Sequence, residues 1–217
     1  MKWKYKNNAE GYEEETNPFP NGLPLFINTG GPEMMMPAPA GIRVVENKVF
    51  FYGEIDEQSM LELNRILVEN DIKAQNTKNI LGEGYDPIIH LHINTKGGEI
   101  FAAFSTVDTI RQMKSKVYTY VDGSVASAGT LITAVGAKRF VGAHAHMLIH
   151  QLSSGMFGKF EELEDEMVNL QSMMKVLKDF YKKNTKIPMK KLDEILKKDL
   201  WLTAEECVSF GMVDAIL

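Results

Sequence analysis

The sequence has little of what disulfide-stabilised, membrane-spanning or nucleic-acid-binding proteins need. A single cysteine, Cys207, excludes a disulfide within the chain. Lys and Arg number 24 against 29 Asp and Glu, and no long basic run is present, so no nucleic-acid partner is expected. No apolar run is long enough to cross a bilayer, and the amino-terminal residues contain no apolar signal core. These absences predict a cytoplasmic protein, or one of the host cytoplasm if the gene is viral, with no membrane partner.

What the sequence does contain is enough apolar material for one folded domain. Its 217 residues are 44% hydrophobic, which suits a single sizeable core. Residues 1–41 differ in composition, because they are rich in Asn, Glu, Gly and Pro and have few periodic apolar positions. They predict a flexible amino-terminal arm, and residues 42–217 predict the folded domain. The apolar helical neighbours of Cys207 indicate a packed thiol.

Strand-like and helical segments alternate along the predicted domain. Strands are expected at 48–55, 88–94 and 116–121, and helices at 56–72 and 98–114. Such alternation indicates an α/β domain with a parallel-stranded core. Residues 73–87 are predicted to form a long loop between the first helix and the strand that follows it.

The longest predicted helix covers residues 158–184. Apolar side chains recur in it at steps of three and four residues, which gives one apolar stripe with charged flanks. The stripe consists of Leu163, Met167, Leu170, Met174, Leu177 and Phe180. In a monomer this stripe would cover a core.

Three residues occur in the chain order Ser, His, Asp and have the chemistry of a serine peptidase. Ser127 lies among small residues between a strand-like and an apolar stretch, where a turn exposes a hydroxyl beside free amide hydrogens. His150 ends the apolar stretch MLIH, at the edge of a sheet. Asp199 precedes Leu-Trp-Leu, whose apolar side chains would partly shield a carboxylate that orients an imidazole. Taken singly, each residue also fits a helix cap, a packing position or a surface charge.

Four segments carry a resemblance to a known family. They are INTKGGEI at 93–100, GSVASAG at 123–129, MLIHQL at 147–152 and DLWLTAEECVSFGMVDAI at 199–216. In this order, across residues 45–217, they resemble the glycine-pair, nucleophile, histidine and aspartate segments of the Clp protease proteolytic subunit (ClpP) family. The resemblance implies an α/β, ClpP/crotonase-like fold with a parallel-stranded core and a protruding handle helix.

The resemblance also implies a role for each matching residue. It makes Ser127 the nucleophile, His150 the general base and Asp199 the carboxylate that orients the base. The amide hydrogens of Gly98 and Ala128 would form the oxyanion hole.

A peptide-binding groove follows from the same resemblance. An extended substrate would pair through its backbone with Gly97 on one side and with Leu152, Ser153, Ser154 and Gly155 on the other. Leu152 stands where the family has a proline, and so does Lys96 before the glycine pair. These departures affect the rims of the groove and leave the three catalytic positions unchanged.

The implied function is that of a serine endopeptidase, ATP-independent in itself, which cleaves peptides and unfolded proteins inside an oligomeric chamber. In the family the chamber consists of two stacked heptameric rings, joined by the handle helix at the position of residues 158–184. Substrates come from a separate AAA+ unfoldase. A separate motor is expected here because the sequence contains no phosphate-binding GxxxxGK[ST] loop.

Two other functions stay open at this point. One is a crotonase-type acyl-CoA enzyme, and the other is a catalytically weak structural ring subunit. A metal site is not expected, although His90 and His92, like His144 and His146, have the i, i+2 spacing of two ligands on one strand face. No third ligand has suitable spacing, and no cofactor is predicted.

Overall fold

The computed structural model describes residues 41–82 and 84–217. The predicted flexible arm therefore lies outside the described residues, except for Gly41. The described part contains seven strands: β1 (Ile42–Val45), β2 (Lys48–Tyr52), β3 (Ile88–Thr95), β4 (Lys116–Ala126), β5 (Lys138–Val141), β6 (His146–Leu148) and β7 (Ala215–Ile216).

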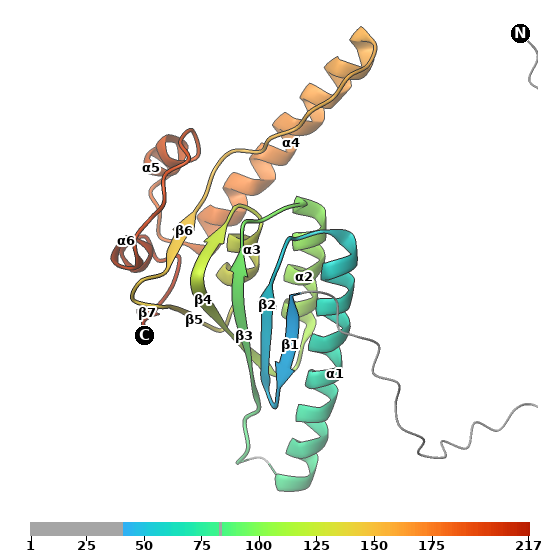
Figure 1. The fold of residues 1–217 in the computed structure, drawn as a ribbon, viewed down its shortest axis with the longest axis vertical. Coiled ribbons are helices and arrows are strands. Elements are labelled where there is room, and N and C mark those ends of the chain that lie inside the picture. The colour runs from blue at the N-terminus through green and yellow to red at the C-terminus, as the bar shows by residue number, and fades with distance from the viewer. Residues whose placement is uncertain (1–40, 83) are drawn as a thin grey trace, which may run out of the picture. The chain divides into compact units, whose positions relative to one another are not determined.

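The strands form one sheet in the order β1-β2-β3-β4-β5-β7, and β6 pairs with the carboxyl end of β4. All pairings between these seven strands are parallel except that between β1 and β2. This arrangement confirms the predicted parallel-stranded core. Since parallel strands end at the same edge of a sheet, the segments after β3, β4 and β6 come together there (Figure 1).

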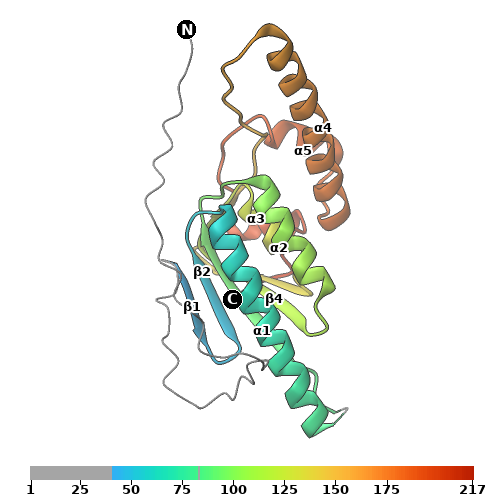
Figure 2. The same ribbon diagram turned by 90° about the vertical axis from the view of Figure 1, so that its right-hand side faces the viewer.

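The described residues also form six helices: α1 (Glu57–Leu81), α2 (Ile100–Gln112), α3 (Gly129–Ala134), α4 (Phe160–Asn184), α5 (Met189–Ile195) and α6 (Ala204–Ser209). The helices α1 and α2 lie side by side against one face of the sheet (Figures 1 and 2). None of the described helices is both long enough and apolar enough to cross a membrane.

The two faces of the sheet carry different kinds of side chain. On β3, Ile89, Leu91 and Ile93 are buried and belong to the same core as the apolar residues of α1 and α2. The alternate positions of the strand face the other way, as the two-residue period of a strand requires. On that second face, four rings stack in a row across β2, β3, β4 and β5; they belong to Phe50, His92, Tyr120 and Phe140.

Two of the histidines considered as metal ligands, His90 and His92, are hydrogen-bonded to other groups. His90 Nδ1 lies 2.7 Å from the Tyr120 hydroxyl, and His92 Nδ1 lies 2.9 Å from Asp122 Oδ2. His144 lies in the turn before β6, so the expectation that it shares a strand face with His146 was wrong. The described residues contain no group of three His, Cys, Asp or Glu side chains that suits a metal ion.

The prediction of a loop over residues 73–87 was wrong for its first half, because α1 continues to Leu81. Polar contacts hold this part of α1 although its apolar periodicity has ended. Asp71 accepts hydrogen bonds from the backbone amides of Lys114 and Ser115, at 3.1 and 2.8 Å. Gln75 donates to Ser115 Oγ at 2.9 Å. The turn between α2 and β4 thus anchors the second half of α1, and the apolar periodicity of the sequence does not reveal this contact.

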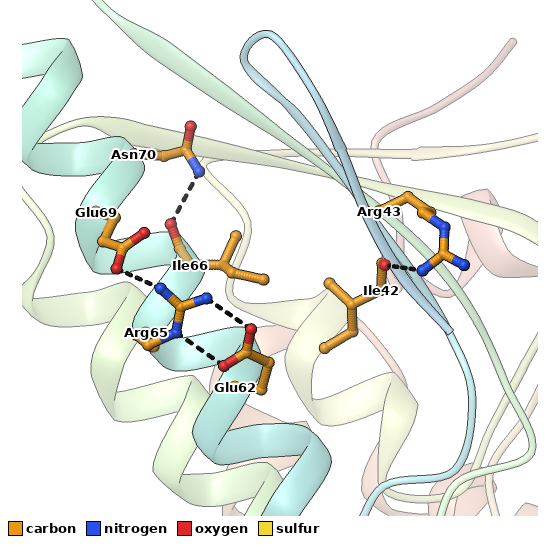
Figure 3. Close-up of polar contacts among 7 residues, drawn as sticks. All are labelled: Ile42, Arg43, Glu62, Arg65, Ile66, Glu69 and Asn70. Atoms are coloured by element: carbon orange, nitrogen blue, oxygen red, sulfur yellow. Dashed lines mark hydrogen bonds and ion pairs between the residues drawn. The ribbon is translucent and has the colours of Figure 1, made fainter. Parts of the chain in front are cut away.

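Side chains on the exposed surface of α1 form helical pairs. Arg65 bonds both Glu62, three residues before it, and Glu69, four residues after it (Figure 3). The same view shows the amide of Asn70 donating to Ile66 O, and Arg43 bonding the carbonyl of its neighbour in β1. Exposed pairs of this kind contribute only a few tenths of a kcal/mol each, roughly. The stability of α1 therefore comes mainly from its buried side.

The helix α4 has two parts with different surroundings. Its last turns are packed, with Leu177, Phe180 and Tyr181 buried. Nearer its start, Leu163 is 42% and Met167 56% exposed. Figure 1 shows this earlier part extending away from the sheet. The interpretation of the stripe as a core cover is therefore correct only for its carboxyl-terminal end.

Cys207 is a packed thiol, as predicted. It is buried in α6, and burial raises its pKa to about 12. A thiol with so high a pKa is almost entirely protonated at neutral pH.

The contact between Asp71 and the α2–β4 turn leads to a stability prediction. Asp71→Ala should lower the free energy of unfolding at pH 7 by about 1–2 kcal/mol, because the charge-assisted bonds are lost and two amides lose their partner. Urea unfolding at pH 7 measures this change. Asp108→Ala, at an exposed position of α2, is the matched control and should have little effect.

The same variant should show a defined pH dependence. Burial alone would raise the pKa of Asp71, but hydrogen bonds from Ser115 and Lys114 outweigh it and lower that pKa. A lowered folded-state pKa means that the stabilisation is complete above about pH 4, the unfolded value, and is lost as the pH falls through the folded value. The difference between wild type and Asp71→Ala should therefore shrink in strong acid. A constant difference across this range would contradict the assigned role.

Candidate active site

Ser127 occupies a strained turn between β4 and α3. Its φ is +54°, which is uncommon for a residue with a side chain. Its backbone N–H donates to Leu148 O at 2.8 Å, so the turn is tied to the end of β6. Two residues after Ser127, the chain requires glycine, because a Cβ on Gly129 would lie 2.3 Å from Thr95 Cγ2. The predicted strand-to-helix turn at Ser127 is present, and the serine side chain is half-buried.

The glycine pair after β3 lies directly beside this turn. Both residues have positive φ, +98° at Gly97 and +145° at Gly98. A Cβ on Gly97 would lie 2.6 Å from Ser127 Cβ, and a Cβ on Gly98 would lie 2.0 Å from Ile55 O. Neither position has room for a side chain, because the backbones approach too closely. The two segments predicted to supply oxyanion donors are thus adjacent in space.

The two predicted donor amides belong to residues of one cavity. Gly98 and Ala128 line a hollow of about 440 Å³ together with Ser127 and His150. Within the described part of the chain, neither the Gly98 nor the Ala128 N–H donates a hydrogen bond to a protein acceptor. Two unpaired amides beside a hydroxyl are what stabilisation of a developing oxyanion requires.

His150 lies two residues beyond the end of β6, with its side chain 26% exposed. It lines the cavity that contains Ser127 and also a smaller hollow that contains Asp199. The His150 Nδ1 and Asp199 Oδ1 atoms are 3.8 Å apart. This distance exceeds that of a hydrogen bond. The structure therefore brings the three predicted catalytic residues into one region without closing the contact between base and carboxylate.

The expected shielding of Asp199 was wrong. Its side chain is 82% exposed. Of the three neighbours that were expected to cover it, Leu200 is 61% and Trp201 46% exposed, and Leu202 is buried in the core. The segment 197–201 lies between α5 and α6, where the described residues supply nothing to cover it.

The predicted groove residues after His150 run beside α4 (Figure 1). They form no strand in this structure. The Leu152 N–H donates to Met174 Sδ at 3.3 Å, and Ser154 Oγ donates to Glu166 at 2.7 Å. Ser153 and Gly155 are exposed. Pairing of this segment with a peptide stays a prediction.

Sequence reasoning missed several residues of the cavity. Its lining also includes the apolar side chains of Leu131 and Leu177, the ring of Tyr181, and the acidic residues Glu54 and Glu99. Tyr181 OH lies 2.7 Å from Thr130 Oγ1, which in turn donates to Ser127 O at 2.7 Å. Leu177 was recognised as part of a helical stripe, but no sequence signal linked that stripe to Ser127, 50 residues earlier.

Comparison with known proteins agrees with this geometry. The family model of Clp protease matches residues 44–217, which include every residue of the cavity described above. A similar protein is the ATP-dependent Clp protease proteolytic subunit of Deinococcus radiodurans. It is 28% identical over 179 residues, which cover 81% of this chain and 82% of that protein.

The close contact at the glycine pair leads to a second stability prediction. Gly98→Ala should lower the free energy of unfolding by roughly 2 kcal/mol or more, because the new Cβ meets Ile55 O and φ is strained. Gly142→Ala is the control, since its Cβ would make only ordinary contacts at 3.6 and 3.7 Å. Thermal and urea unfolding of both variants measure the effect. Equal stability of the two would show that the loop yields easily and that the close approach is not a constraint.

Proposed function

The chain belongs to the Clp protease family, and on that premise we propose that Ser127, His150 and Asp199 hydrolyse peptide bonds as nucleophile, general base and orienting carboxylate. One observation carries the proposal. The strained Ser127 turn shares a cavity with His150 and with two amides that have no protein acceptor. The family match does not favour an acyl-CoA enzyme or a purely structural subunit.

The reaction is an acyl transfer in two halves. Ser127 Oγ attacks the carbonyl carbon of the substrate while His150 takes the hydroxyl proton. Since Nδ1 of His150 faces Asp199, Nε2 is the nitrogen available to Ser127. The Gly98 and Ala128 amides stabilise the oxyanion of the tetrahedral intermediate. His150 then protonates the leaving amine, and a water molecule repeats the sequence to release the acyl group.

Catalysis requires the contact between His150 and Asp199 to shorten from 3.8 Å. Catalytic hydrogen bonds are often long in unliganded structures and tighten in the substrate complex. The exposure of Asp199 leaves its side chain free to move toward the imidazole. Assembly or substrate binding would supply the cover that the single chain lacks.

The cavity suggests which peptides would bind. The leucines that line it, Leu131, Leu152 and Leu177, would take an apolar side chain next to the cleaved bond. The backbone of Gly97 and of residues 152–155 would pair with an extended substrate. This mode selects unfolded chains and short peptides over folded proteins.

The proposed working form is an assembly of stacked heptameric rings. The exposed apolar side chains of α4, among them Phe160, Leu163 and Val168, would be covered by another copy, and α4 would then join the rings. The relative in Deinococcus radiodurans is described as ATP-dependent. By analogy, a separate AAA+ unfoldase would deliver substrates, which would place the enzyme in the cytoplasm, where ATP is available.

Substitution of the nucleophile gives the first test. Ser127→Ala should lower kcat for a fluorogenic peptide by on the order of 10⁶, as loss of the nucleophile does in subtilisin. A fluorophosphonate probe should label wild type at Ser127, and mass spectrometry should find no adduct in the variant. Particle mass measured on the same samples shows whether assembly is intact. Normal turnover by a pure Ser127→Ala preparation would refute the proposal.

Substitution of the exposed carboxylate tests the third role. Asp199→Asn should lower kcat by about 10⁴, because the amide no longer holds the imidazole in the required tautomer. Asp108→Asn, at an exposed position of α2, should leave kcat unchanged. If Asp199→Asn retains full activity, then Asp199 is a surface charge and another group orients His150.

A further inference from the structure

A chain of hydroxyl groups connects the base of α4 to the nucleophile turn. Thr130 Oγ1 lies 2.7 Å from both Ser127 O and Tyr181 OH. The direction of these bonds is fixed, because the Ser127 carbonyl can only accept. Thr130 has one hydroxyl proton and uses it for that carbonyl. Tyr181 must therefore donate its proton to Thr130.

Tyr181 is held rigidly at its end of this chain. It is 2% exposed, and its ring meets that of Phe180 edge to face. Phe180 in turn packs against Phe104 of α2. Burial raises the pKa of the Tyr181 phenol well above its ordinary value, so the phenol stays protonated and remains a donor.

The carbonyl at the other end belongs to a functional peptide group. The Ser127 C=O and the Ala128 N–H are parts of one planar unit, and the described chain contains no cis peptide bond. In a trans peptide these two groups point in opposite directions. A bond that fixes the Ser127 oxygen therefore also fixes the direction of the Ala128 N–H. Thr130 holds this oxygen twice, through its hydroxyl and through its backbone N–H at 3.0 Å.

We propose that Tyr181 is a positioning residue, which acts through Thr130 to aim the Ala128 N–H at the substrate oxyanion. This inference rests on the proposed function, since it assigns the oxyanion donor to the same site. Tyr181 does not itself touch the reacting atoms. Its role is to fix, through the Thr130 hydroxyl, the plane of the peptide group that follows the strained Ser127 residue.

The decisive variant is Tyr181→Phe, which keeps the ring and removes only the donor. Because the oxyanion develops only as the bound substrate reacts and is absent from the ground state, kcat should fall while KM stays within about two-fold. The expected loss is about tenfold in kcat, less than the 10²–10³ that follows removal of a whole donor. A kcat within two-fold of wild type in the folded variant would overturn the proposal.

Variants at Thr130 separate positioning from packing. Thr130→Val removes the hydroxyl and should lower kcat at least as much as Tyr181→Phe, whereas Thr130→Ser keeps the hydroxyl and should restore near-normal turnover. Adding Tyr181→Phe to Thr130→Val should cause no further loss, since Tyr181 acts through Thr130. Additive losses would show that Tyr181 acts by another route and would refute the proposal. Tyr120→Phe is the matched control, because its hydroxyl bonds His90 outside the cavity.

A second measurement keeps this proposal distinct from the proposed function. Hydrogen exchange of the segment 127–131, measured by mass spectrometry on the whole protein, should be faster in Tyr181→Phe than in wild type or Tyr120→Phe. If wild type neither hydrolyses peptides nor reacts with the fluorophosphonate, the proposed function fails, and the exchange result still decides whether Tyr181 fixes the turn. Unchanged exchange would refute the positioning role even in an active enzyme.

Discussion

The site depends on one close approach between two backbone segments, the glycine pair after β3 and the turn after β4. Ser127 can approach Gly97 this closely because Gly97 has no side chain. A Cβ on Gly97 would lie only 2.6 Å from Ser127 Cβ. This approach fixes the spacing between the two amides and the hydroxyl. The sheet maintains it, since β3 and β4 are neighbouring parallel strands that end at the same edge. The rest of the described fold supports these two strand ends.

The helix α4 connects the buried core to an exposed apolar surface. Its last turns lie in the core and hold Tyr181 against α3, whereas its first turns present apolar side chains to solvent. A continuous hydrogen-bonded helix connects these two parts. Any contact made by the exposed part is thus joined mechanically to the residues that line the cavity.

The sequence predicted the parts of the structure whose determinants are local. Alternating strand and helix patterns indicated the parallel core, and the small residues around Ser127 indicated its turn. It did not predict the second half of α1, because Asp71 and Gln75 bind a turn about 40 residues away. The exposure of Asp199 was missed for a related reason. Apolar neighbours in sequence shield a carboxylate only if they fold over it, and Trp201 and Leu200 face solvent.

The tie between Ser127 N and Leu148 O has a consequence for how this protein tolerates mutation. This main-chain hydrogen bond sets the distance between the turn that carries Ser127 and the strand that leads to His150. The pairing of β4 with β6 reinforces it. Main-chain bonds do not depend on which side chains the strands carry. Many side chains of β4 and β6 can therefore be substituted without a change in the spacing between Ser127 and His150. The site tolerates substitutions in the strands that build it.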